Sequence, residues 1–427
     1  MPRRAILTLV LIILLIPRPG VAGAQEPDRP VVDGVALERT RVSGIDLFFD
    51  PDVDPEAVKT AGAALVLGLA DVPELTGLPP FTTPIVAYIL ADDDRFRLAL
   101  AAIANVRVEL VAEDIGGYTI ERDGTMLIFF AAPNVARPPG AVLGYTHELA
   151  HLAVREATQR RPLPQWFNEG YASWISGRAL ARHHPVEAAL QGQLDRLSVA
   201  SALHTRDLIP WADLVTRSRF SRAGVEGLVS LAYGQSTLFV DFLANRHGTP
   251  ALARFLTILG EGAGATQAFG TAFGPFGPEA TAYEQALADL KLEYQPGLYV
   301  VQRPGAERPA VLAAVGGPTL ETAVVELLVD GELMRRREVD FDGSGMLVAS
   351  LPPTLLEGAG NVRLRVTAPH LGVLELDPIA GTSVRPAALP SRAPASAPVR
   401  IEPAPAPAPA QVPTRIGVFP RALARAA

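Results

Sequence analysis

The sequence contains no cysteine among its 427 residues. Disulfide bonds, thiol catalysis and thiolate metal sites are therefore excluded, and any bound metal must be held by histidine and carboxylate side chains. This absence leaves the compartment open, because a cysteine-free chain folds in either redox environment.

Long runs of positive charge are also lacking. The formal net charge is −7 and the pI is about 5.6, which argues against a nucleic-acid partner. Hydrophobic residues make up 48% of the chain. A chain of this length with that composition is expected to fold as two or three packed domains.

The N-terminus combines a basic start with a short apolar run. Arg3 and Arg4 precede the apolar residues 5–16, and Ala22-Gly23-Ala24 supplies an A-x-A cleavage site. The pattern predicts a secretory signal peptide over residues 1–24, because the apolar run is too short to span a bilayer; an uncleaved anchor is the alternative. We therefore expect a secreted or periplasmic protein with no transmembrane span after signal cleavage.

Residues 25–140 show the pattern of an α/β sheet subdomain. Asp123-Gly124 separates two β-rich arms, residues 117–122 and 125–130, which is a strong signal for a hairpin. Residues 92–94 are three successive aspartates. They could suggest a metal site, but acidic residues also favour a helix N-terminus through its dipole, and we prefer that interpretation.

The remaining chain divides into three parts. Residues 141–295 are predicted to form a helical catalytic subdomain, and the short β-branched segments of residues 296–382 predict a small all-β module resembling a β-sandwich. Residues 383–427 are rich in proline and alanine and predict a disordered, extended tail. The fold class is therefore α+β.

A possible calcium loop occurs near Asp340 and Asp342 in the all-β module. The other ligand positions of such a loop are missing. We therefore interpret Asp342-Gly343-Ser344-Gly345 as a hairpin turn between two strands.

The strongest motif in the chain is His147-Glu148-Leu149-Ala150-His151, an H-E-x-x-H pattern. On a helix, residues four apart lie on the same face, so both imidazoles can reach one metal ion while Glu148 stands beside a metal-bound water. Glu169, on the next predicted helix, could supply a third ligand. Two histidines, one carboxylate and an open fourth position are typical of a catalytic zinc site. The alternative is that both histidines are buried core residues that bind no metal.

This motif, together with Trp166-Phe167-Asn168-Glu169-Gly170-Tyr171-Ala172, resembles the peptidase-MA-like family of gluzincins, which are zinc metallopeptidases similar to thermolysin and aminopeptidase N. The resemblance covers about residues 85–260. It implies a thermolysin-like zincin core with a small mixed sheet and a helical lobe. It also implies that His147, His151 and Glu169 bind one Zn²⁺ ion and that Glu148 is the general base.

The same resemblance implies two further features. The strand 125–130 would be an edge strand beside the site that binds an extended peptide by β-addition. Tyr233, in Leu231-Ala232-Tyr233-Gly234-Gln235, would donate a hydrogen bond to the developing oxyanion. The alternative for Tyr233 is an interior tyrosine that packs its helix.

Two departures from the family pattern are visible. The Gly-x-Met-Glu-Asn element that anchors a free amino terminus is absent, because Gly124-Thr125-Met126 continues into Leu127. This argues against exopeptidase action and favours an endopeptidase or an unusual hydrolase. Ser173 also stands where thermolysin-type enzymes carry the aspartate that orients a histidine ligand.

These patterns lead to two hypotheses of different class. The first is an exported zinc metallopeptidase that hydrolyses a peptide or protein substrate with a metal-activated water and Glu148 as base. The second is a non-catalytic, zinc-holding binding or scaffold protein on a peptidase fold, with attachment to the cell envelope through the C-terminal module and tail. The complete ligand set beside Glu148 favours the enzyme.

Overall fold

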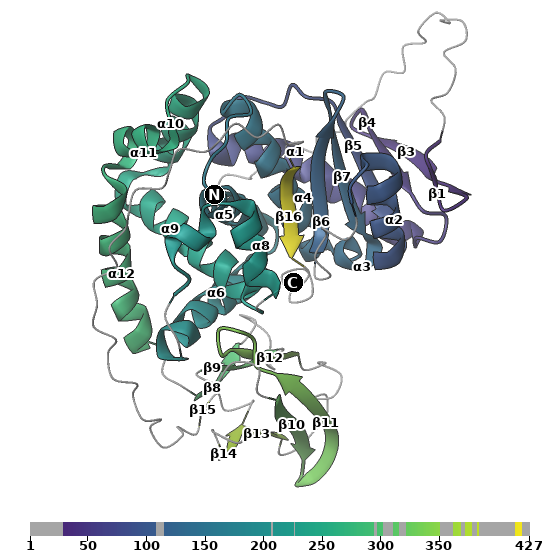
Figure 1. Cartoon of the computed structure of the whole chain (residues 1–427). Coiled ribbons are helices and arrows are strands. Elements are labelled where there is room, and N and C mark those ends of the chain that lie inside the picture. Colours follow the sequence, from purple (N-terminus) through teal and green to yellow (C-terminus); the bar gives the residue numbers. More distant parts are fainter. Residues whose placement is uncertain are drawn as a thin grey trace, which may run out of the picture.

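The protein is described here by a computed structural model, which covers residues 29–107, 115–205, 208–225, 227–293, 297–301, 311–315, 322–350, 362–368, 372–377, 382–383 and 415–420. The expected signal peptide lies outside these residues, as does most of the proline-rich tail. The described chain is a mixed α and β structure with a six-stranded sheet, a helical lobe and two smaller sheets near the C-terminus (Figure 1).

The six-stranded sheet is mixed: β4, β5 and β7 pair in parallel, and the other pairs are antiparallel. In spatial order its strands are β16 (Arg415–Pro420), β6 (Ile115–Arg122), β7 (Thr125–Ala131), β5 (Ile85–Leu90), β4 (Ile45–Phe49) and β3 (Glu38–Val42). A separate small ribbon joins β1 (Val31–Val32) to β2 (Val35–Ala36).

The predicted hairpin forms between β6 and β7. Its turn residues Asp123 and Gly124 have φ values of 51° and 75°, as a two-residue hairpin with positive φ at both positions requires. The prediction that strand 125–130 is an edge strand is wrong, because β7 lies between β6 and β5. Its apolar run Met126–Ala131 is buried throughout, as expected for an interior strand that is covered on both faces.

Four helices accompany the sheet: α1 (Pro55–Thr76), α2 (Asp93–Ala104), α3 (Ala132–Val135) and α4 (Pro138–Ala157). Asp54 caps α1, since its Oδ1 accepts a hydrogen bond from the Glu56 amide. Asp92 likewise caps α2 by accepting from the Arg95 amide. The three aspartates therefore begin a helix, as we preferred.

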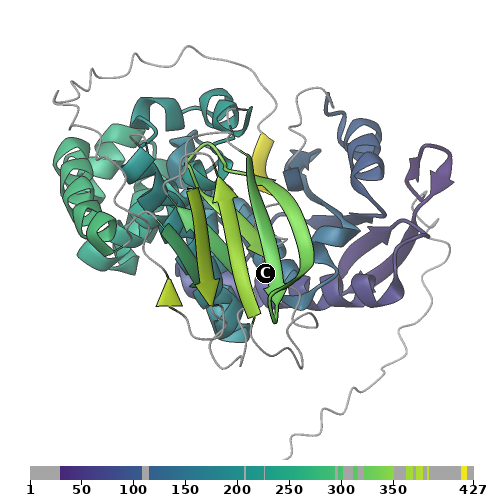
Figure 2. The ribbon, with the colours of Figure 1, turned by 90° about the horizontal axis from the view of Figure 1, so that it is seen from below.

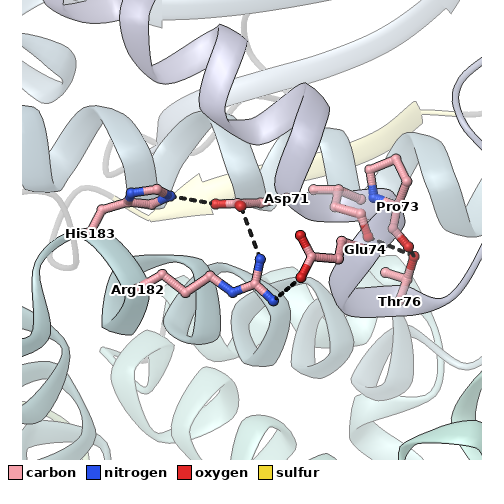
Figure 3. Close-up of polar contacts among 7 residues, drawn as sticks. Asp71, Pro73, Glu74, Thr76, Arg182 and His183 are labelled. Atoms are coloured by element: carbon pink, nitrogen blue, oxygen red, sulfur yellow. Dashed lines mark hydrogen bonds and ion pairs between the residues drawn. The ribbon is translucent and has the colours of Figure 1, made fainter. Parts of the chain in front are cut away.

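A polar cluster joins α1 to the helical lobe (Figure 3). The carboxylate of Asp71 accepts hydrogen bonds from Arg182, at 3.2 Å, and from His183, at 2.7 Å. Arg182 also donates to Glu74, at 2.8 Å. Arg182 and His183 end helix α5, so this cluster fixes the far end of α5 against α1.

The helical lobe follows α4 and lies on the β16 side of the sheet (Figure 1). Its helices are α5 (Gln165–His183), α6 (Pro185–Thr205), α7 (Trp211–Leu214), α8 (Arg217–Val225), α9 (Val229–His247), α10 (Thr249–Gly260), α11 (Ala265–Phe273) and α12 (Phe276–Glu293). Trp166 of α5 is buried against aromatic rings of other helices, including Trp211 and Phe239.

The C-terminal strands form two sheets, seen in front of the helical lobe in Figure 2. One sheet has the order β11 (Glu332–Asp340), β10 (Thr322–Val329), β13 (Val362–Ala368), β14 (Gly372–Asp377) and β15 (Thr382–Ser383). The other contains β12 (Leu347–Ser350), β9 (Val311–Val315) and β8 (Gly297–Val301).

The segment Asp342–Gly345 is not a hairpin turn, because the strands on its two sides, β11 and β12, belong to different sheets. Oδ1 of Asp342 accepts hydrogen bonds from the amides of Ser344 and Met346. The Ser344 carbonyl accepts from Thr205 of α6 at 2.9 Å. The turn therefore connects the two sheets and contacts the helical lobe.

The expectation of a wholly disordered tail is corrected at one place. Residues 415–420 form β16, which pairs antiparallel with β6 at the end of the six-stranded sheet. The proline–alanine alternation stops before this point, and Ile416, Val418 and Phe419 have high strand propensity.

Within the described residues, no helix combines the length and hydropathy needed to cross a membrane.

Candidate metal centre

Helix α4 carries the two histidines in the interior of the protein. Its first turn begins with Pro138, whose fixed φ suits that position. Every residue from Gly140 to Val154 is buried. His147 and His151 are both 0% exposed, and their rings face each other edge to face with centroids 4.7 Å apart. Polar side chains buried this deeply must find a partner to offset their desolvation.

Helix α5 brings Glu169 to the same point. Oε1 of Glu169 accepts a 2.6 Å hydrogen bond from Gln165, one turn earlier. Its other oxygen, Oε2, lies 3.4 Å from Nε2 of His147 and 3.5 Å from Nε2 of His151. The two Nε2 atoms are 3.1 Å apart. Three buried ligand atoms therefore form a nearly equilateral triangle.

This triangle fits a zinc ion. Zinc binds imidazole nitrogen and carboxylate oxygen at about 2.0–2.2 Å in a tetrahedral arrangement, which places neighbouring ligand atoms about 3.3–3.6 Å apart. The observed separations of 3.1 to 3.5 Å are close to that spacing. Oε2 of Glu169 is also buried without a hydrogen-bond partner among the described residues. The group meets the geometric requirements of a three-ligand metal site.

Two of the three groups, His147 and Glu169, also favour the ionisation states that bind metal. Burial lowers the pKa of His147 to about 4, which keeps this imidazole neutral. Burial alone would raise the pKa of Glu169, but the neighbouring imidazoles hold it well below its usual range. For His151, burial lowers the pKa, but the carboxylates of Glu169 and Glu148 outweigh burial and raise it above the ordinary value. A metal cation would replace that proton.

Glu148 lies on the same helix and is 0% exposed. Burial raises its pKa to about 7, against the opposing influence of His151. Oε2 of Glu148 accepts a hydrogen bond from the hydroxyl of Thr119 on β6. Oε1 is buried and has no hydrogen-bond partner among the described residues. One oxygen is therefore held in place, while the other is free to exchange a proton.

Tyr233 of α9 lies beside this group. Its ring centroid is 6.2 Å from that of His147 and, in a T-shaped arrangement, 5.2 Å from that of Phe220. Burial first and Glu169 second raise the pKa of Tyr233 well above its ordinary value, so the hydroxyl stays protonated. The structure thus brings all five predicted residues together, and Tyr233 both packs its helix and faces the ligand group.

Sequence reasoning missed two neighbours of the site. Thr119 contacts Glu148 from a sheet strand, and its place in a period-2 strand gave no sign of this. Arg217 of α8 lies 5.7 Å from the Tyr118 ring, and its positive charge lowers the pKa values of Glu148 and Tyr233. Nη1 of Arg217 is buried without a hydrogen-bond partner among the described residues. No local motif marks either residue.

Ser173 occupies the place at which the sequence departs from the thermolysin pattern. Its hydroxyl oxygen is 3.5 Å from Nδ1 of His147. At that distance it is a weak partner for the histidine, compared with the carboxylate that often orients a metal ligand.

No family model and no curated protein matches the chain. Among solved structures, it is similar to yeast LTA4 hydrolase in complex with bestatin, with a TM-score of 0.36 and 11% identity over 59% of this chain and 38% of that chain. The chain thus spans well under half the length of that protein.

A second similar structure is an aminopeptidase N family protein from Idiomarina loihiensis. The TM-score is 0.41, with 11% identity over 76% of this chain and 70% of that chain.

Proposed function

We propose that the protein is a zinc-dependent metallopeptidase. The observation that carries the proposal is the buried triangle of His147, His151 and Glu169, with ligand atoms 3.1 to 3.5 Å apart, beside a carboxylate with one free oxygen. A purely structural site would use all its ligand positions and would not need Glu148.

Each residue then has a distinct role. His147, His151 and Glu169 would hold the ion, which when bound supplies a Lewis acid and lowers the pKa of a water molecule. Glu148 accepts a proton from the attacking water on Oε1 and delivers it to the leaving amine as the C–N bond breaks. Thr119 keeps the other carboxylate oxygen in position. Tyr233 donates a hydrogen bond to the oxygen of the scissile carbonyl as negative charge develops there.

We further propose that the substrate is a polypeptide and that the protein acts outside the cytoplasm. The second part rests on the basic, apolar and A-x-A pattern of residues 1–24. Amino-terminal sequencing of the protein recovered from an expressing cell tests it: a mature chain that starts near Gln25 is expected, and an unprocessed cytoplasmic chain would contradict it.

The decisive experiment for the activity compares Glu148→Gln with Glu156→Gln. Both variants make the same chemical change on α4, but Glu156 lies at the far end and accepts hydrogen bonds from Thr83 and Thr82. We expect one zinc per protein in both by mass spectrometry of the metal. On a mixed peptide library, kcat should fall about 10²- to 10⁴-fold in Glu148→Gln only.

Two outcomes would contradict the proposal. Unchanged cleavage by Glu148→Gln would remove Glu148 as the base. Wild-type protein that holds zinc but cleaves no member of the library would favour the non-catalytic binding or scaffold protein instead.

A further inference from the structure

The last described segment of the chain lies beside the candidate active site. Strand β16 extends the six-stranded sheet at β6, with Gly417 opposite Thr119 and Val418 opposite Tyr118 (Figure 1). β16 also contacts α4, the helix that carries both histidines. This segment reaches the site from the far end of the sequence, through the proline- and alanine-rich residues 384–414.

Two of the β6 residues opposite β16, Thr119 and Tyr118, contact groups around Glu148. Thr119 donates its hydroxyl hydrogen to Glu148, and the ring of Tyr118 lies under the Arg217 guanidinium. An extended chain paired with this stretch of β6 therefore passes directly along the groups that surround Glu148.

An exposed strand edge offers a row of unpaired amide and carbonyl groups, which an extended peptide can use for added β-pairing. Because β7 is interior, β6 is the strand that presents such an edge on this side of the sheet. Backbone pairing needs no particular side chains, so this edge suits extended polypeptides of varied sequence. Only one chain can occupy it at a time.

We propose that Arg415–Pro420 is a built-in occupant of the outer edge of β6. The tail then competes with an extended polypeptide substrate for the same backbone groups. This inference rests on the proposed peptidase function for its effect on activity, but the docking itself does not depend on catalysis.

The residues of Arg415–Pro420 are suited to reversible pairing with β6. Gly417, opposite Thr119, adds no side chain next to the residue that holds Glu148. Pro420 has no amide hydrogen and therefore weakens further pairing at that end. Because β16 and β6 belong to one chain, their pairing is intramolecular, and even a weakly binding strand can stay docked at any protein concentration.

The main test compares the full chain with a chain that ends at Ala410. If the tail occupies the edge about nine-tenths of the time, its removal lowers KM about tenfold and leaves kcat unchanged. Addition of the hexapeptide Arg-Ile-Gly-Val-Phe-Pro to the shortened chain should restore the higher KM by competitive inhibition. An unchanged KM would overturn the competition.

A point variant keeps the chain length and controls for loss of the tail. Val418→Pro removes an amide donor within β16, whereas Val412→Pro makes the same change outside the strand. We expect Val418→Pro to reproduce the lower KM and Val412→Pro to behave as wild type. Equal KM values for the two variants would contradict the proposal.

Amide hydrogen exchange of β6 separates this inference from the proposed activity. Removal of the tail should speed exchange in residues 115–122, and the hexapeptide should slow it again, even in a protein without measurable peptidase activity. Identical exchange in both chains would overturn the docking. Protection that disappears on dilution would assign the strand to a second molecule and overturn the intramolecular occupant.

Discussion

The hydroxyl of Tyr233 is the residue-scale feature whose contribution can be isolated most cleanly. Tyr233→Phe removes one oxygen and keeps the ring that packs against Phe220. Because a preorganised donor to an oxyanion contributes most in the transition state, we expect kcat to fall about 10²- to 10³-fold with little change in KM.

Zinc content is the control for that substitution. The hydroxyl is not one of the three ligand groups, so metal occupancy should equal that of the wild type. Phe220→Leu provides a comparison, because it alters the packing around Tyr233 without removing the donor. A wild-type kcat in Tyr233→Phe would leave Tyr233 with a packing role alone.

Asp195 illustrates a different residue-scale effect, on stability. Burial raises the pKa of this α6 carboxyl from 3.8 to about 6, although Gln191 donates a 2.9 Å hydrogen bond to it. The folded state therefore holds the proton more tightly than the unfolded state. This contribution to stability is complete below about pH 3.8 and is lost as the pH rises through 6.

Asparagine at position 195 cannot ionise and can still accept the Gln191 hydrogen bond. We expect Asp195→Asn to raise the free energy of unfolding by about 1–2 kcal/mol at pH 7.5. Denaturant unfolding at several pH values measures this difference, which should vanish below about pH 4. A constant difference at all pH values would exclude ionisation as the cause.

At the scale of elements, the approach of α5 to α9 positions Glu169 next to Tyr233. Gly170 makes the approach possible, because a Cβ at this position would lie only 2.5 Å from the Ser236 carbonyl oxygen. We expect Gly170→Ala to destabilise the protein by about 1–3 kcal/mol, since backbone must shift to relieve the overlap. Zinc affinity should also fall, because Glu169 moves with α5.

Gly177 offers a matched control on the same helix. A Cβ there meets nothing within 4 Å, and alanine has the higher helix propensity, so Gly177→Ala should stabilise by about 0.5–1 kcal/mol. Thermal unfolding and competition with a zinc chelator measure both effects. Equal thermal stability and equal zinc affinity of the two variants would show that close packing at Gly170 does not position Glu169.

At the scale of the whole molecule, metal binding should be coupled to folding. The ligands come from α4 and α5, and the unfolded chain does not bring them together, so bound zinc stabilises the folded state. At a free zinc concentration 1,000 times Kd the gain is about 4 kcal/mol. Removal of zinc by a chelator should therefore lower Tm by several degrees.

Calorimetry with and without chelator tests this coupling. The variant Glu169→Gln serves as the control, because a neutral amide is a poorer zinc ligand than a carboxylate and its Tm should respond little to the chelator. A wild-type Tm that is insensitive to chelator would argue that the His–His–Glu group does not bind metal strongly.

Local sequence patterns correctly predicted a helix start and a hairpin. The aspartates 92–94 begin a helix as their dipole preference indicated, and Asp123-Gly124 forms the expected hairpin. Sequence patterns gave wrong predictions where the structure depended on which strands pair with each other in a sheet. Residues 125–130 were expected at an edge and lie inside the sheet, and Asp342–Gly345 joins two sheets in place of two paired strands.

The sequence by itself determined that His147 and His151 share one helix face, because an i, i+4 spacing is a property of the helix alone. It also determined that cysteine takes no part in any metal site. Only the tertiary structure decided that Oε2 of Glu169 completes a triangle of zinc dimensions, that Thr119 holds Glu148, and that residues 415–420 lie on β6. Those contacts join segments far apart in the chain, and their distances depend on packing that no local pattern records.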